Sequence, residues 1–233
     1  MPSAAERTRT LVQSTCSAVL VVPGVEAPLP EQLVPEGRTV GEDGEVYLLF
    51  PADSPAVRAA THAQDDELSA VLELTDVAPV SVPHRIRGRA WVSGWLTRVP
   101  GVAEPGRMLL RLEVGEAYVD DLWGAQAVEP DDFAAAAPDP LVEHETELLQ
   151  HLASVHGGQV RELRTLLGER AAGAADLRAA PLALDRFGLR LRFSDGHGPR
   201  GHCFDVRFDF PEPVADVTGL RRAMRTLFEA ARS

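Results

Sequence analysis

Residues 85–97 read RIRGRAWVSGWLT, and two kinds of side chain alternate along this stretch. Successive side chains of a β-strand point to opposite faces, so the alternation predicts a strand with two unlike faces. One face is small or apolar and suits the interior of a β-barrel. The other carries guanidinium and indole groups in the order Arg85, Arg87, Arg89, Trp91, Ser93 and Trp95.

The stretch predicts one arm of an antiparallel hairpin. A second alternating stretch at residues 108–118 follows a connection rich in proline and glycine. Short apolar runs at residues 18–22, 46–50 and 70–74 predict further strands. Ser54-Pro55 supplies the N-cap and first-turn proline of a short helix that ends near residue 63. The N-terminal half is therefore predicted to be a small β-barrel with one helix.

The C-terminal part predicts a mixture of helices and strands. Asp139-Pro140 marks the start of an amphipathic helix that ends near His156, and apolar positions in 160–167 predict a second helix. Alternation at residues 189–193 and 203–210 predicts two strands, and a final helix follows with Asp216 or Thr218 as its cap. The order of elements is ααββα.

Composition excludes several classes of protein. The chain has 233 residues, 23 basic against 35 acidic, and every basic residue is arginine. Without lysine there is no Walker A phosphate loop and no Schiff-base chemistry. Residues 1–138 carry a net charge of −11 and residues 139–233 a net charge of −1. Neither part has the basic excess that nucleic-acid binding requires, so we expect no nucleic-acid partner.

The sequence predicts a soluble cytoplasmic protein with no membrane partner. Two cysteines, Cys16 and Cys203, do not make a disulfide framework in a chain of this length. The longest early apolar run is shorter than the core of a signal peptide, and no run approaches the ~20 residues of a membrane span.

The arginine–tryptophan face is the first candidate site. Arginine matches phosphate and carboxylate geometry, and tryptophan offers a flat stacking surface. A planar anionic cofactor such as haem or FMN would suit Arg85, Arg87, Arg89, Trp91, Ser93 and Trp95. An equally weighted interpretation is a solvated arginine face with its tryptophans buried against another domain or subunit.

Histidines give two weaker candidate sites. His197 and His202 lie in or beside a glycine-rich loop at residues 194–201, next to Cys203, and are candidate ligands of haem iron or zinc. The favoured interpretation is structural: His202 shares the parity of Phe204 and Val206 and would cap the core. His144, His151 and His156 share a predicted helix, but His156 lies about 140° around a straight helix from His151. We expect His156 to make helix-end hydrogen bonds.

The chain resembles the HugZ-type haem-utilisation family. The matching stretches are residues 139–141 (DPL), 149–156 (LQHLASVH), 184–192 (LDRFGLRLR) and 206–214 (VRFDFPEPV). The upstream half resembles the FMN-binding split barrel of the pyridoxamine-phosphate-oxidase type through residues 85–95. The resemblance implies α+β architecture: a split β-barrel at 1–123, a linker at 124–138 and a C-terminal ααββα domain of unknown function at 139–233. His151 and His156 fall on its helix motif, where a structural role is expected.

The same resemblance implies a homodimer and a set of functions. Members include haem-degrading oxygenases, a chloroplast protein that binds an enzyme of tetrapyrrole synthesis, and uncharacterised actinobacterial chains, whose high-GC genomes suit the arginine-rich composition. The leading expectation is haem or tetrapyrrole binding, with haem degradation as a further activity. The alternatives are a non-enzymatic module that regulates tetrapyrrole or iron metabolism through a partner protein, and an FMN-dependent oxidoreductase. The sequence leaves open whether the chain is an enzyme.

Overall fold

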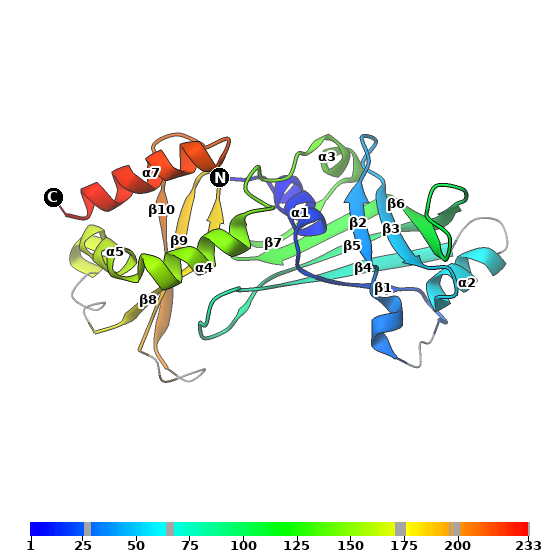
Figure 1. Cartoon of the computed structure of the whole chain (residues 1–233), viewed down its shortest axis with the longest axis horizontal. Coiled ribbons are helices and arrows are strands. Elements are labelled where there is room, and N and C mark those ends of the chain that lie inside the picture. The colour runs from blue at the N-terminus through cyan, green and yellow to red at the C-terminus, as the bar shows by residue number, and fades with distance from the viewer. Residues whose placement is uncertain (26–28, 64–67, 171–175, 196, 198–200, 233) are drawn as a thin grey trace. The chain divides into compact units, whose positions relative to one another are not determined.

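A computed structural model of the chain describes residues 1–25, 29–63, 68–170, 176–195, 197 and 201–232 (Figure 1). The chain forms two compact units. The N-terminal unit comprises Pro2–Asp76 and Gly88–Pro138. The C-terminal unit comprises Asp139–Ser233 together with Val77–Arg87 and Met1. The mixture of helices and antiparallel strands confirms the α+β class.

The N-terminal unit is built on a curled seven-stranded sheet. Six strands follow the order β1-β4-β5-β6-β3-β2, and β7 pairs with Ala117–Asp121 of β6 on the edge opposite β5. The long strands β5 and β6 form the predicted antiparallel hairpin. The bounds are β1 (Ser17–Val21), β2 (Gly37–Val40), β3 (Val46–Pro51), β4 (Leu68–Val77), β5 (Ile86–Val99), β6 (Arg107–Asp121) and β7 (Gly124–Val128).

Alternate residues of these strands fill the core of the N-terminal unit. Val46, Leu48 and Phe50 of β3 are fully buried, while the residues between them are half-buried. On β5 the predicted small and apolar set is buried at Ala90, Val92 and Leu96, but Ile86 at the start of the strand is 50% exposed. Burying a side chain of this size is worth about 1.5–3 kcal/mol, so strand alternation decides which face of the sheet turns inward.

A bulge interrupts the pairing of β5 with β6 between Ser93 and Gly94. A Cβ atom placed on Gly94 would lie 1.7 Å from the backbone oxygen of Glu113. Only glycine permits this approach of the two backbones, and the bulge adds bend and twist to the long hairpin.

Four short helical segments accompany the sheet: α1 (Ala4–Gln13), the 3₁₀ turn η1 (Pro30–Leu33), α2 (Pro55–His62) and α3 (Pro130–Ala135). The predicted cap of α2 is confirmed, since the Ser54 hydroxyl accepts a hydrogen bond from the Val57 N–H. The segment expected to be a linker instead contains β7 and α3. Phe133 of α3 is fully buried in the core, which ties the segment to the sheet.

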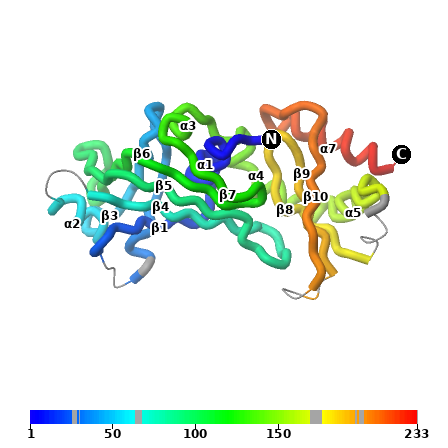
Figure 2. Tube along the Cα trace, turned by 180° about the vertical axis from the view of Figure 1, so that it is seen from behind, coloured from blue at the N-terminus to red at the C-terminus, as the bar shows by residue number. Residues whose placement is uncertain are grey.

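The C-terminal unit pairs a three-stranded antiparallel sheet, in the order β10-β9-β8, with helices on one face. Figures 1 and 2 show this unit from opposite sides. The bounds are α4 (Glu145–Val155), α5 (Gly157–Glu162), η2 (Leu163–Arg170), β8 (Arg178–Asp185), β9 (Gly188–Ser194), β10 (Cys203–Asp209) and α7 (Val217–Ala230). The predicted β9–β10 pair and the Asp216 cap of α7 are confirmed.

The first helix of this unit begins later than the sequence predicts. Asp139 does not cap an α-helix but accepts hydrogen bonds from the backbone N–H groups of Leu141 and Arg186, each 2.9 Å away. Burial raises the pKa of the Asp139 carboxyl, and these backbone N–H groups partly offset that effect. Helix α4 starts at Glu145, after a series of turns.

The segment Val77–Arg87 is held by backbone and side-chain contacts to the rest of the C-terminal unit. The Ala78 N–H donates to the Arg85 carbonyl oxygen at 2.7 Å, which closes the segment into a loop. Arg192 of β9 donates to the backbone oxygens of Pro83 and His84 at 2.6 and 2.7 Å. No helix in the described part of the chain is long and apolar enough to span a membrane.

Candidate functional site

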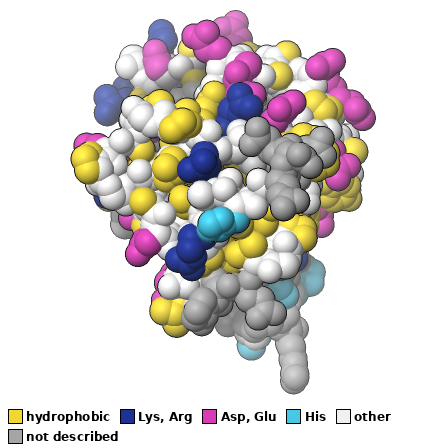
Figure 3. All heavy atoms as spheres, turned by 90° about the vertical axis from the view of Figure 1, so that its right-hand side faces the viewer, with side chains coloured by type: hydrophobic (Ala, Val, Ile, Leu, Met, Phe, Trp, Pro, Cys, Tyr) yellow, Lys and Arg dark blue, Asp and Glu magenta, His cyan; other side chains and the backbone are white. Residues whose placement is uncertain are grey.

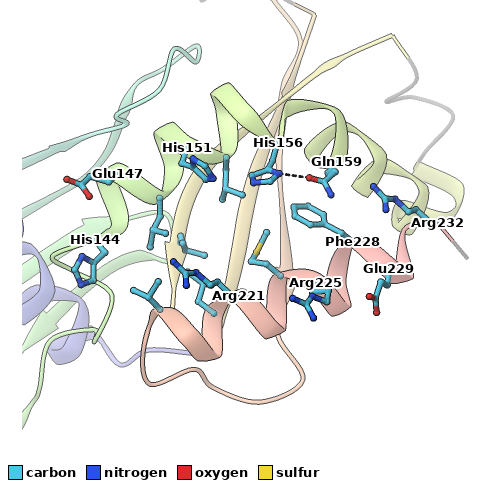
Figure 4. Close-up of a pocket in the computed structure, with 16 residues that line it drawn as sticks. His144, Glu147, His151, His156, Gln159, Arg221, Arg225, Phe228, Glu229 and Arg232 are labelled. Atoms are coloured by element: carbon cyan, nitrogen blue, oxygen red, sulfur yellow. Dashed lines mark hydrogen bonds between the residues drawn. The ribbon is translucent and has the colours of Figure 1, made fainter.

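The C-terminal unit contains a cavity of about 870 Å³ between α4 and α7 (Figure 4). Leu184 of β8 also lines it, as do His156 and Gln159 at the start of α5. The volume lies within the range of about 300–1,000 Å³ that small-molecule and cofactor sites occupy.

Helix α4 supplies one wall of the cavity through a single stripe of side chains. Glu147 and Leu148 are followed four residues later by His151 and Leu152, which places the two pairs on one face of the helix. His144, the residue that precedes the helix, continues the stripe. The wall therefore alternates apolar leucines with polar groups that could contact a ligand.

Helix α7 supplies the opposite wall with the same spacing. Leu220, Met224 and Phe228 are buried on its inner face. Arg221 and Arg225 each follow one of these apolar residues, so their guanidinium groups stand at the edge of the apolar surface.

Two histidine rings meet where α4 ends. The ring centroids of His151 and His156 are 5.0 Å apart in an edge-to-face arrangement. The straight-helix estimate predicted that they diverge. The helix ends at Val155, however, and the backbone of His156 has left the regular α-helical conformation. The ring of His156 also lies 6.3 Å from that of Phe228, so it faces α7 across the cavity.

Charged side chains of both signs line the cavity, since Glu147 and Glu229 lie there with the arginines. Among the described residues, neither Arg221 nor Arg225 forms an ion pair or a side-chain hydrogen bond. Arg232 is paired with Glu162 through an Nε–Oε2 distance of 3.0 Å. Two guanidinium groups on one helix face are thus available to a carboxylate or phosphate.

The chemistry that the cavity offers is threefold. Its leucine, methionine and phenylalanine side chains would contact a flat apolar ligand, its two unpaired arginines would bind acidic groups, and its histidines would supply a nitrogen ligand. Within the described ranges no three His, Cys, Asp or Glu side chains gather closely enough to hold a bare metal ion. The residues therefore fit an organic group that brings its own metal better than a free ion.

The arginine–tryptophan face predicted on β5 is divided between the two units. Arg85 and Arg87 belong to the C-terminal unit, and the residues from Arg89 to Trp95 to the N-terminal unit. Arg85 donates to the Ala78 carbonyl oxygen at 2.8 Å. The buried Arg87 forms two hydrogen bonds to Glu145, at 2.7 and 3.0 Å, and one to the Leu182 carbonyl oxygen. The Arg87 guanidinium is thus occupied by contacts within the C-terminal unit.

The remaining members of that face have mixed surroundings. Arg89 is exposed and Ser93 is half-buried beside the bulge. The ring of Trp91 lies 5.9 Å from that of Tyr118. Trp95 is 48% exposed and lines a second hollow, of about 790 Å³, with Arg98 and Arg111.

Figure 3 shows the end of the N-terminal unit that carries α2, where scattered basic side chains lie among hydrophobic ones. In the hollow beside Trp95, Arg111 donates to the Thr97 hydroxyl and lies 3.4 Å from Glu45. These contacts occupy its guanidinium, so we rank this hollow below the cavity between α4 and α7.

The histidines of the β9–β10 connection do not line either cavity. Asp195 organises the described part of this turn, because its carboxylate accepts hydrogen bonds from the backbone N–H groups of His197 and His202. Those bonds lower the pKa of the Asp195 carboxyl. The His197 side chain is 80% exposed. Residues 196 and 198–200 of the predicted glycine-rich loop lie outside the described residues.

Sequence reasoning identified the α4 histidines but missed the arginines that face them. Arg221 and Arg225 are four residues apart and adjoin the apolar positions Leu220 and Met224 of the predicted final helix. Two arginines four residues apart, next to an apolar stripe on the same helix, were the signal that the sequence offered. Nothing local indicates that it faces His151, some 70 residues earlier in the chain.

Comparison with known proteins shows the fold of the chain. No family model and no curated protein matches the sequence. Among solved structures, a heme binding protein from Mycobacterium smegmatis aligns over 100% of this chain and 98% of its own, with 20% identity and a TM-score of 0.63. A protein of unknown function from Agrobacterium tumefaciens aligns over 96% and 94%, with 15% identity and a TM-score of 0.40. The chain shares the fold of the mycobacterial protein.

Proposed function

We propose that this chain binds haem or a related tetrapyrrole in the cavity between α4 and α7. The observation that carries the proposal is the meeting of His151 and His156 with the unpaired Arg221 and Arg225 around one apolar cavity. The shared fold with a protein described as heme binding supports the choice of ligand class.

Three kinds of side chain in the cavity match the three chemical parts of haem. The apolar macrocycle would pack against the apolar side chains of Leu152, Leu220 and Phe228, and this contact would remove apolar surface from water. The propionates would pair with Arg221 and Arg225. An imidazole nitrogen of His151 or His156 would bind the iron, as in many haem proteins. The iron would supply redox chemistry when the group is bound.

The arginines are expected to orient the group rather than to provide most of its affinity. Both are exposed, so each charge pair with a propionate is worth about 1 kcal/mol or less. The apolar contacts contribute the larger share, at roughly 25 cal/mol for each Å² removed from water.

Titration of the purified protein with haemin tests the proposal. We expect a Soret band that differs from that of free haemin and saturates at one haemin per chain. Arg221→Glu/Arg225→Glu reverses both charges and should weaken binding about tenfold or more, since a tenfold change corresponds to about 1.4 kcal/mol.

Arg222→Glu is the matched control. Arg222 lies on the same helix and is exposed, but it does not line the cavity. Its charge reversal should change the dissociation constant by less than twofold to threefold. The proposal fails if micromolar haemin leaves the spectrum unchanged, or if the Arg222 variant loses as much affinity as the double variant.

A further inference from the structure

His156 sits at a break between two helices, where its side chain is freed from the regular stripe of α4. His156 follows the last residue of α4, and α5 begins directly after it with Gly157-Gly158. The side chain is half-buried and lines the cavity. Its ring centroid lies 5.0 Å from that of His151 and 6.3 Å from that of Phe228. The ring therefore has one aromatic neighbour on α4 and one on α7.

The partner of His156 fixes which nitrogen carries its proton. The Nδ1 atom lies 2.5 Å from the side-chain oxygen Oε1 of Gln159. An amide oxygen only accepts hydrogen bonds, so Nδ1 must donate and must carry the hydrogen. A neutral imidazole has one N–H, which leaves a lone pair on Nε2. Metal-ligating histidines use this arrangement, with one ring nitrogen donating to a fixed oxygen and the other bound to the metal.

His151 lacks a comparable constraint. Its side chain is exposed, and its ring nitrogens have no hydrogen-bond partner among the described residues. Its ring is placed only by the edge contact with His156. An unconstrained ring loses more conformational freedom on binding a metal, so His151 is the weaker candidate although it lies closer to the middle of α4.

We propose that His156 is the protein ligand of the haem iron through Nε2, and that Gln159 is the positioning residue that holds the ring proton on Nδ1 and fixes the direction of the ring. This inference rests on the proposed haem binding and adds to it a specific ligand.

Three single variants and two porphyrins separate this inference from the proposed function. Iron-free protoporphyrin IX reports the cavity alone, by its fluorescence, and haemin reports the cavity together with the axial bond. We expect His156→Ala to bind protoporphyrin IX within about threefold of the wild type. The same variant should lose the wild-type Soret position and electron paramagnetic resonance signature with haemin, and added imidazole should restore both.

His151→Ala tests the competing ligand. Because His151 lines the cavity, haemin affinity is free to fall, but the Soret position and the electron paramagnetic resonance signature should stay those of the wild type. Gln159→Leu should keep the iron ligand but weaken haemin binding by about tenfold, at the lower end of what loss of an orienting partner costs a metal site. If the wild type binds neither porphyrin, the proposed function fails. If haemin binds but His156→Ala keeps the wild-type spectrum, or His151→Ala alone abolishes it, only the ligand assignment is overturned.

The ligand-free protein provides an independent readout. Nitrogen-15 spectra of the imidazole groups should show the His156 proton on Nδ1 in the wild type, and Gln159→Leu should shift the population toward the other tautomer. A wild-type proton on Nε2 would mean that the Gln159 amide faces the ring through its NH₂ group, and would overturn the assignment.

Discussion

The ion pair between Arg87 and Glu145 should be among the most stabilising contacts of the C-terminal unit. The side chains are 7% and 20% exposed and meet through two hydrogen bonds. Arg87 also donates to the Leu182 carbonyl oxygen, and Glu145 accepts from the Leu184 N–H at 3.0 Å. Arg87→Met therefore leaves a buried carboxylate without its main partner, which costs about 3–5 kcal/mol.

A double-mutant cycle measures the pair itself. Arg87→Met, Glu145→Gln and the double variant are compared by urea unfolding. The double variant should lose less free energy of unfolding than the two single losses combined, with a coupling of about 1.5–3 kcal/mol for charge-assisted bonds of this geometry. Helical circular dichroism is the suitable signal, because all three tryptophans lie in the N-terminal unit.

The exposed pair of Arg107 with Glu36 serves as the control. Its side chains are 45% and 40% exposed, so Arg107→Met should cost less than about 1 kcal/mol. The reasoning would be refuted if Arg87→Met cost no more than this control, or if the cycle gave no coupling.

Three further predictions concern the fold. Asp139→Asn should destabilise the protein, because an amide cannot accept from both the Leu141 and Arg186 N–H groups. Burial raises the pKa of Asp139, so the folded protein binds a proton there more tightly than the unfolded chain does, and this stabilises the wild type at low pH. The contribution is lost as pH rises above about 4. The difference in free energy of unfolding between wild type and Asp139→Asn, measured with urea, should therefore be larger at about pH 4 than at about pH 7. Gly44→Ala places a Cβ 2.5 Å from the Cβ of Ala134 at a φ of +86°, so it should lower the melting temperature through both a clash and backbone strain. Gly101→Ala, at a φ of +78° with open space around it, carries only the backbone cost of about 1–2 kcal/mol. Equal losses of melting temperature in the two variants would contradict the clash. Asp216→Ala removes the acceptor for the Gly219 N–H and should cost about 1 kcal/mol, detected as a lower melting temperature that Asp216→Asn largely avoids.

Local signals predicted those elements that depend on their own residues. The β5–β6 and β9–β10 pairs were evident from alternation, and the caps Ser54 and Asp216 from side-chain chemistry. Each of these signals lies within a few residues of the element that it specifies, so tertiary contacts only reinforce it.

Elements that depend on distant partners were missed. Helix α1 buries Arg7, which pairs with Asp121 at 2.8 Å, so a side chain that suggests a surface position is internal. Strand β8 contains Pro181 and no β-branched residue, and its pairing with β9 overrides that weak propensity.

The candidate site was predictable only in part, for the same reason. The helix motif gave His151 and His156, but the meeting of their rings depends on where α4 ends. The unpaired arginines come from α7, and only the folded chain brings the two helices to one cavity.

The path of the chain through Val77–Arg87 constrains how such a protein can evolve. Strands β4 and β5 of the N-terminal sheet lead directly into and out of this segment of the other unit. A gene fragment beginning at residue 139 would encode Arg192 without its carbonyl partners and Glu145 without Arg87. Recombination at a single breakpoint therefore cannot transfer the C-terminal unit intact, and the two units should be inherited, duplicated and lost together.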